Sequence, residues 1–253
     1  MNKMSRAIVK GRILILILAV LLLIPAAIGY IKTRTNYDVL TYLPKDIETM
    51  KGQDILANDF GTGAFSLVVV ENMKDKDIVK MVDQMETVDH VKKVVWYGSL
   101  MDITVPEELL PENLQEEISS GDAKLMAVIY DTTLSADETM NAVEELRGII
   151  GKNAFLSGMS AVVVDTKNLS NKEVPVYVGL AVLLCFVVLT LTMDSFLIPV
   201  FFLLSIGFAV VYNLGSNFIQ GEISYVTKAL AAVLQLAVTM DYSIFLWHSY
   251  CAE

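Results

Sequence analysis

The sequence has 253 residues, of which 54% are hydrophobic, and its formal net charge is −10. Its mean hydropathy of +0.53 is high, since only about 45–50% of the residues of a typical soluble domain are apolar. A chain this acidic lacks the basic face that nucleic-acid binding requires, so nucleic acid is excluded as an expected partner. The apolar residues are concentrated in residues 13–31 and 174–248, which indicates a membrane region.

The first apolar run, residues 13–31, contains no charged residue and is long enough to cross about 30 Å of hydrocarbon as a helix. Four basic residues and no acidic residue lie in the preceding segment 1–12. The positive-inside rule therefore places this basic amino terminus in the cytoplasm. A cleaved signal peptide is the alternative interpretation, because Pro25-Ala26-Ala27 resembles the small-residue segment before a cleavage site.

Residues 32–172 have the polar composition of a soluble domain and carry nearly all of the negative charge. Their alternating and helical periodicities predict short strands and amphipathic helices in turn. The expected strands are 65–71, 91–97, 124–130 and 154–157, and the expected helices are 75–88, 106–118 and 138–150. This order predicts an extracytoplasmic α+β domain of the split βαβ type, inserted between the first and second membrane spans.

Three further spans are predicted at 174–193, 196–214 and 226–248. From Met159 the sequence has no clear helix stop before Pro175, so a helix is expected to run from the domain into the second span. With the first amino end inside, the loop 215–225 is external and the carboxyl terminus is cytoplasmic. The expected fold is a four-helix membrane bundle in the cell (cytoplasmic) membrane, with the lipid bilayer as its surroundings.

No grouping of residues typical of an enzyme is present in the sequence. No histidine accompanies a serine or cysteine nucleophile, and no glycine-rich phosphate loop follows a strand. His90 and His248 lie far apart, and the two cysteines, Cys185 and Cys251, lie in or beside the membrane region. We therefore expect no catalytic residues, no metal and no cofactor.

Asp241 is the residue of the membrane region that most needs an explanation. It lies inside the fourth span, where a central carboxylate costs about 2.5–3.5 kcal/mol on insertion scales. Its neighbours at three and four residues' distance are apolar and cannot donate a hydrogen bond, so any partner comes from another helix or from water. Low dielectric disfavours the charged form, which makes a proton carrier one interpretation. A neutral aspartic acid that is simply buried in the bundle is the other.

A polar edge lies beside Asp241 on the same helix. Tyr242 is about 100° away around the helix axis and shares a face with Gln235 and Thr239, and approximately with Lys228. We expect Tyr242 to act with Asp241, and Gln235 and Thr239 to give polar support. Such a helix is suited to the middle of a bundle rather than to a lipid-facing position.

The arrangement of an external α/β domain between the first two of four spans, with Asp-Tyr in the fourth, resembles one repeat of the resistance–nodulation–division (RND) superfamily. The segment 236–246, with sequence LAVTMDYSIFL, is similar to the fourth-helix motif of the mycobacterial-membrane-protein-large (MMPL) branch. Gly158 and Asn213-Leu214-Gly215 are similar to further features of that family. Asp194 is a departure, because the turn before the third span usually carries an arginine.

The resemblance implies efflux by proton antiport, driven by the proton gradient, of hydrophobic or lipid-like substrates, including lipid export. It implies that Asp241 and Tyr242 form the proton relay. Members of the superfamily contain two repeats, so the resemblance also implies a second repeat, or a second copy of the chain, as partner, and this chain as the first half of an exporter. Two alternatives remain: a membrane-anchored sensor or assembly scaffold that displays an external binding domain, and an accessory protein of the related protein-translocation type.

Overall fold

The computed structural model describes residues 10–38, 40–59, 63–100, 119–193 and 195–252. The chain divides into two compact units. The helical unit consists of Met1–Asn36 and Leu169–Glu253, and the α/β unit consists of Tyr37–Asn168. The predicted helix 106–118 and the departure at Asp194 lie outside the described residues.

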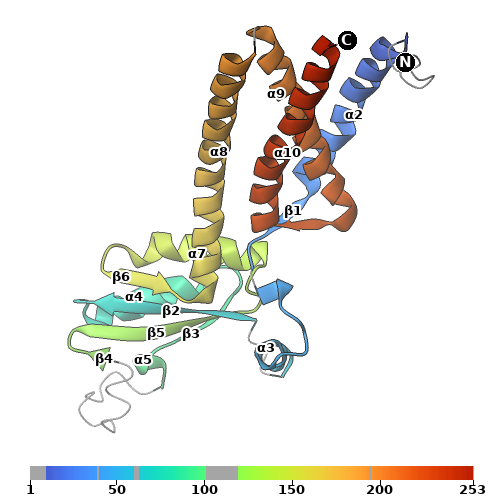
Figure 1. Ribbon diagram of the computed structural model, residues 1–253. Coiled ribbons are helices and arrows are strands. Elements are labelled where there is room, and N and C mark those ends of the chain that lie inside the picture. Colours follow the sequence, from blue (N-terminus) through green and yellow to red (C-terminus); the bar gives the residue numbers. More distant parts are fainter. Residues whose placement is uncertain (1–9, 39, 60–62, 101–118, 194, 253) are drawn as a thin grey trace. The chain divides into compact units, whose positions relative to one another are not determined.

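The helical unit is built from α2 (Arg12–Lys32), the later part of α8 (Met159–Thr192), α9 (Leu197–Ser216) and α10 (Tyr225–Ala252) (Figure 1). Within the described residues, four helices are long and apolar enough to cross a membrane. Their outer surfaces are apolar, with Ile31 80% and Leu191 81% exposed. Such surfaces are stable only in contact with lipid or another protein. The predicted helical membrane bundle is confirmed at this level, and α8 runs without a break from Met159 as expected.

Two glycines allow α2 and α9 to pack at close range. A Cβ atom on Gly215 would lie 2.2 Å from the carbonyl oxygen of Ala26, and one on Gly29 would lie 2.3 Å from the carbonyl oxygen of Gly215. The Tyr212 hydroxyl also donates a hydrogen bond to the carbonyl oxygen of Ala19. Small residues at a crossing let the backbones of membrane helices approach, which increases van der Waals contact without a hydrophobic driving force.

Strands β1 (Arg34–Asn36) and β7 (Glu222–Ser224) form a short parallel pair. This differs from the sequence analysis, in which 32–36 began the soluble domain and 215–225 was a loop. That range contains the end of α9, the 3-10 turn η3 (Asn217–Gln220), β7 and the first residue of α10. Three-residue strands have too few positions to show an alternating pattern, so the pairing left no readable signal.

The α/β unit contains a sheet in the order β3-β5-β2-β6, with β4 paired to β5. The strands are β2 (Ala64–Glu71), β3 (Val91–Val95), β4 (Ser119–Ser120), β5 (Ala123–Tyr130) and β6 (Ala154–Ser157). All of its pairings are antiparallel. Strands β2 and β3, which α4 connects, are separated in the sheet by β5.

Helices α4 (Asp75–Glu86) and α7 (Asp137–Ile150) supply the helical half of the core. Their apolar residues recur at helical spacing, and Ile78, Met85 and Leu146 are fully buried. Alternate residues of β2, including Ser66 and Val68, are buried on one face of the sheet. Helices α4 and α7 pack on that face and bury it.

One buried polar pair lies within this core. The Tyr130 hydroxyl donates a hydrogen bond of 3.1 Å to the Ser66 hydroxyl, and neither residue is exposed. Burial raises the pKa of Tyr130 to about 12, although the hydrogen bond with Ser66 and the charge of Arg147 act in the opposite direction. The phenol is therefore a neutral core group that keeps its hydrogen bond.

Two local features join the sheet to the start of α8. Gly158, between β6 and α8, has a φ of +101°, a conformation that L side chains rarely adopt. The Arg147 guanidinium on α7 then forms two hydrogen bonds, of 2.6 and 2.9 Å, with the Asp165 carboxylate on α8. This bidentate pair links α7 to the first turns of α8 within the α/β unit.

One helix of this unit was not predicted. Helix α3 (Glu48–Asn58) follows the 3-10 turn η1 (Leu40–Tyr42) and carries Gly52 in its interior. An interior glycine weakens a helix by about 1 kcal/mol relative to alanine, which also weakens the sequence signal for it. A short helix, α5 (Tyr97–Leu100), also follows β3, where the predicted strand continued to residue 97.

Candidate functional site: an acidic residue on α10

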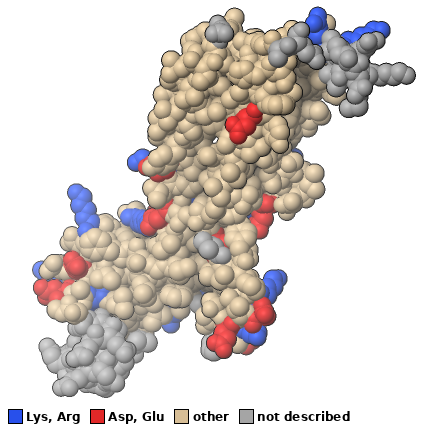
Figure 2. Space-filling view, in the orientation of Figure 1, with Lys and Arg blue, Asp and Glu red and all other residues tan. Residues whose placement is uncertain are grey.

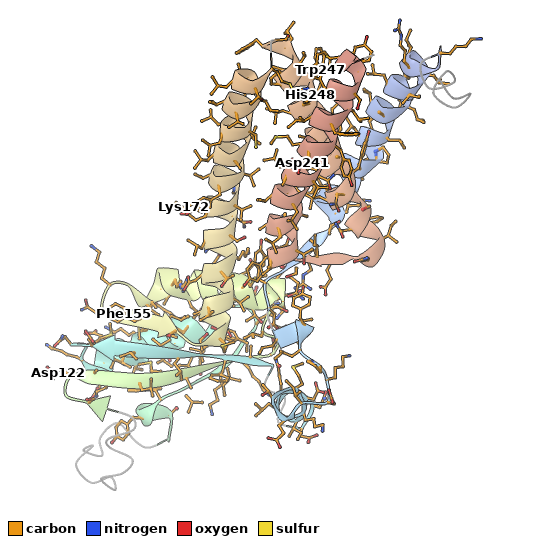
Figure 3. The ribbon with its side chains drawn as sticks, viewed as in Figure 1. Asp122, Phe155, Lys172, Asp241, Trp247 and His248 are labelled. Carbon is orange, nitrogen blue, oxygen red and sulfur yellow. The ribbon has the colours of Figure 1, made fainter. Side chains whose placement is uncertain are left out.

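Asp241 lies on α10, about midway along the apolar stretch of that helix (Figure 3). Its side chain is exposed on the helical unit. Figure 2, in the same orientation, shows an acidic patch within a broad uncharged surface over this part of α10. Val238 and Phe245, which flank it at i−3 and i+4, are also exposed, at 54% and 68%. The carboxylate is therefore part of an apolar surface that requires lipid or protein contact.

No residue that the structure describes forms a hydrogen bond or ion pair with Asp241. An ionised carboxylate is stable in a low-dielectric medium only when it is paired and hydrogen-bonded. Its partner has to come from another helix or from water, and the described residues of α2, α8 and α9 do not provide one. Among the residues that the structure describes, the site is therefore an acidic group without the hydrogen-bond donor that its charged form needs.

Gln235 and Thr239, predicted as polar support, are brought together by the structure. The Gln235 side-chain amide donates a 2.8 Å hydrogen bond to the Thr239 hydroxyl. Asn213 on α9 donates a longer bond of 3.4 Å to the Gln235 carbonyl oxygen. On the other side, the Ser243 hydroxyl donates to the Thr239 main-chain oxygen at 2.8 Å. These four residues form a polar ladder, Asn213-Gln235-Thr239-Ser243, that runs along α10 and reaches α9.

Tyr242 does not join this ladder. Its side chain is 68% exposed, and no described residue forms a hydrogen bond with it. Helical geometry places it next to Asp241 around the axis, so both side chains lie at the surface of the helical unit. Sequence reasoning found Asp241, Tyr242, Gln235 and Thr239 but did not assign a site role to Asn213 or Ser243. Asn213 could have been found from the sequence, because its amide lies within the otherwise apolar third span.

A second polar contact lies where α10 begins. The Lys228 ammonium lies 5.2 Å from the centre of the Tyr30 ring and donates a 3.2 Å hydrogen bond to the Thr35 hydroxyl. An ammonium over an aromatic face is stabilised by the negative charge density of the ring. Lys228 thus has partners from α2 and β1 close to the end of the span, where long basic side chains are tolerated.

The described residues contain no group of three or more side chains that could hold a metal ion. The polar groups of the candidate site, in the described parts of α9 and α10, are Asp241, Tyr242 and the polar ladder. A carboxyl group of this kind can bind and release a proton. It can also exchange one set of partners for another when its charge changes.

Comparison with known protein families decides the classification. The model of the MMPL family matches residues 41–251, which include most of the α/β unit and the three helices α8, α9 and α10. The chain belongs to the MMPL family. The predicted resemblance is confirmed, and MMPL membership together with the four apolar helices supports a multi-pass membrane protein. It also suggests a transporter of the RND type.

A curated relative gives the same result at low identity. "Membrane protein YdfJ" of Bacillus subtilis (strain 168) is 24% identical to this MMPL protein over 271 residues. The match covers 97% of this chain and 35% of the relative. The chain therefore spans about a third of the length of the curated relative that it matches.

Proposed function

We propose that this MMPL protein is part of an exporter driven by the proton-motive force, with Asp241 as the proton-binding group and Tyr242 beside it. The observation that carries the proposal is a carboxylate that pairs with no described residue, on a helix long and apolar enough to span a membrane. Intramembrane acidic residues are costly and mark ion or proton pathways. Family membership supports transport as the process that is coupled to the proton.

The physical cycle follows from the two charge states of the carboxyl group. Protonated Asp241 is neutral and is stable against lipid or an apolar helix, whereas ionised Asp241 requires a donor or water. Binding and release of a proton therefore change which surroundings of α10 are stable. Tyr242 is suited to donate a hydrogen bond to the charged form after a rearrangement. The ladder from Asn213 to Ser243 keeps the adjacent face of α10 against α9.

The missing donor is proposed to come from a second repeat, or from a second copy of the chain. The exposed apolar surface around Asp241 supports this assignment, because it is suited to contact with another helix. In this arrangement the present chain acts as the amino-terminal repeat. Transporters built from two related repeats place their ion sites at the interface between the repeats.

The α/β unit is proposed to be the extracytoplasmic porter domain of this repeat, of the split βαβ type. The separation of β2 and β3 by β5 supports that type, since a split βαβ unit has a strand inserted between its two parallel strands. The basic segment 1–12 supports a cytoplasmic amino terminus, and thus an external position for the domain. Hydrophobic or lipid-like molecules are proposed as the exported substrates.

Dicyclohexylcarbodiimide tests the central assignment directly, because it modifies protonated carboxyl groups in apolar surroundings. The full chain in lipid nanodiscs is treated at several pH values, and the modified peptides are identified by mass spectrometry. We expect modification of Asp241 that decreases as the pH rises, while the solvent-exposed Asp122 remains unmodified as the internal control. Absence of modification at Asp241 at low pH, in a folded chain, would show that it is not a proton-binding site open to the bilayer.

A further inference from the structure

A small cavity lies at the end of the helical unit where α2 ends, β1 follows and α10 begins (Figure 1). Its volume is about 10 Å³, and it is lined by Tyr30, Thr33, Thr35, Leu214, Ile223 and Lys228. A space of about 10–15 Å³ is what one water molecule needs. The cavity therefore has room for a single oxygen atom of a ligand whose remainder lies outside it.

The alternation of the short strand pair decides which side chains face this cavity. Thr35 and Ile223 are register partners, and both line it. Glu222, one residue earlier on β7, lies on the opposite face of the pair because successive strand residues alternate. Its carboxylate accepts a hydrogen bond from the Asn36 side chain, on that same opposite face. The acidic group of the strand pair is thus directed away from Lys228.

Lys228 is the cation of the cavity, and its side chain is half-buried. Its ammonium has three N–H groups. Of these, the described residues engage one with the Thr35 hydroxyl and one with the Tyr30 ring, and they provide no acidic partner. The first turn of α10 contains no acidic residue either. Since a buried charge is stable when it is paired, the surroundings of Lys228 favour an anion.

Thr35 adds a second donor beside this ammonium. Its hydroxyl accepts the 3.2 Å hydrogen bond from Lys228, and no described residue accepts the hydroxyl proton in turn. A hydroxyl both donates and accepts, so that proton is available to a ligand. Thr33 adds no donor, because its hydroxyl donates to the Gly29 carbonyl oxygen. One anionic oxygen can therefore accept charge-assisted hydrogen bonds from Lys228 and Thr35 together.

The position of the cavity along the spans indicates which anion this is. The first span ends at Lys32, and Lys228 lies in the first turn of the span that begins at Tyr225. Residues near the ends of membrane spans lie at the depth of the lipid head groups. The exposed side chains of Lys32 and Arg34 add positive charge at the same end. Basic groups at this depth attract anionic lipid head groups.

We propose that Lys228 and Thr35 bind one phosphoryl oxygen of a membrane phospholipid whose acyl chains remain in the bilayer. The site is distinct from the proposed proton site, because Asp241 lies about 20 Å further along α10 at about 1.5 Å per residue. The inference goes beyond the proposed function and does not depend on it. It requires only that the helical unit lies in a membrane.

The test uses the full chain in detergent micelles and native mass spectrometry, which resolves the number of bound lipid molecules. Phosphatidylglycerol is the phospholipid probe, and diacylglycerol with the same acyl chains is the probe without a phosphate. We expect the wild type to bind phosphatidylglycerol about ten-fold more tightly than diacylglycerol, as for a hydrogen bond to a charged group. Lys228→Met, which keeps an unbranched side chain but removes the charge, should abolish this preference.

Lys32→Met is the matched control. Lys32 is a lysine at the same end of the unit that also lies near an aromatic ring, that of Phe218, but it does not line the cavity. Its preference for phosphatidylglycerol should stay within about two-fold of the wild-type value, since exposed charges contribute little. An equal loss of preference in Lys32→Met and Lys228→Met would show general attraction to negative head groups and would overturn the proposal.

Thr35→Val tests the second donor, because valine keeps the shape of threonine without the hydroxyl. It should weaken binding of phosphatidylglycerol about three-fold, and unchanged binding would contradict the assignment even if Lys228→Met fails to fold. A Tm in detergent close to that of the wild type shows that a variant is folded. A folded Lys228→Met chain with the wild-type preference would overturn the proposal.

Inorganic phosphate distinguishes a lipid from a free anion. An excess of it, compared with chloride at equal ionic strength, should leave phosphatidylglycerol bound to the wild type, because the acyl chains hold the lipid at the site. Displacement of the lipid by inorganic phosphate would assign the site to a soluble anion and would overturn the proposal for a membrane phospholipid.

Discussion

Replacement of Gly215 by alanine should separate α2 from α9. The new Cβ would lie 2.2 Å from the Ala26 carbonyl oxygen and 2.7 Å from its carbon, whereas ordinary contacts begin at 3.4 Å. The atoms in contact are backbone atoms, so no side chain can move aside, and the helices must separate locally by about 1 Å. Overpacking of this kind costs about 1–3 kcal/mol. The packing of α2 against α9 should be destabilised by that amount.

The assay is thermal unfolding of the full chain in detergent micelles. A loss of about 2 kcal/mol should lower the Tm of Gly215→Ala by about 5 °C. Gly207→Ala is the control on the same helix, since a Cβ there has no heavy atom within 4 Å. Its Tm should stay the same or rise slightly because alanine favours the helix. Equal Tm values for the two variants would refute the close approach of α2 and α9.

Three further predictions concern the α/β unit and use denaturant unfolding of a Trp247→Phe chain, in which Trp96 is the remaining tryptophan. The pKa of Tyr130 is about 12 in the fold and about 10 when unfolded, so the stability that this shift contributes is complete below pH 10. About 3 kcal/mol of the free energy of unfolding should be lost as the pH rises from 10 to 12. Tyr130→Phe should abolish that loss, and a variant whose stability still falls by the same amount over this range would contradict the prediction. Leu146→Ala, at a fully buried position of α7, should cost about 2–5 kcal/mol, and a loss below 1 kcal/mol would show a looser core. Arg147→Gln should cost no more than about 1 kcal/mol, because its partner Asp165 is 61% exposed, and a loss of 3 kcal/mol would show a buried ion pair instead.

The parts of the fold that sequence reasoning predicted have long, regular patterns. The apolar runs of α2 and α9 are visible because lipid requires about 20 apolar residues in succession. Helix α4 and strand β2 were recognisable because each buries one face, at a spacing of 3.6 or 2 residues. These signals are local, so no knowledge of distant segments was needed.

The features that were not predicted depend on contacts between segments far apart in the chain. Strands β1 and β7 pair although Asn36 and Glu222 are 186 residues apart, and neither strand has a pattern of its own. The hydrogen bond from Asn213 to Gln235 likewise depends on how α9 meets α10. Sequence reasoning identified Asp241 because its cost in lipid is independent of its neighbours. It could not determine which surface of α10 carries the carboxylate.

Proton movement across a membrane that contains the protein tests the central claim most directly. Proteoliposomes with a pH-sensitive dye inside would report proton flux after a pH gradient is imposed, for the wild-type protein and for its Asp241→Asn variant. Asparagine keeps the shape of the side chain but cannot carry the proton, so we expect flux to fall to the level of empty liposomes, with Asp122→Asn equal to the wild type. Proton flux in Asp241→Asn equal to that of the wild type would contradict the account.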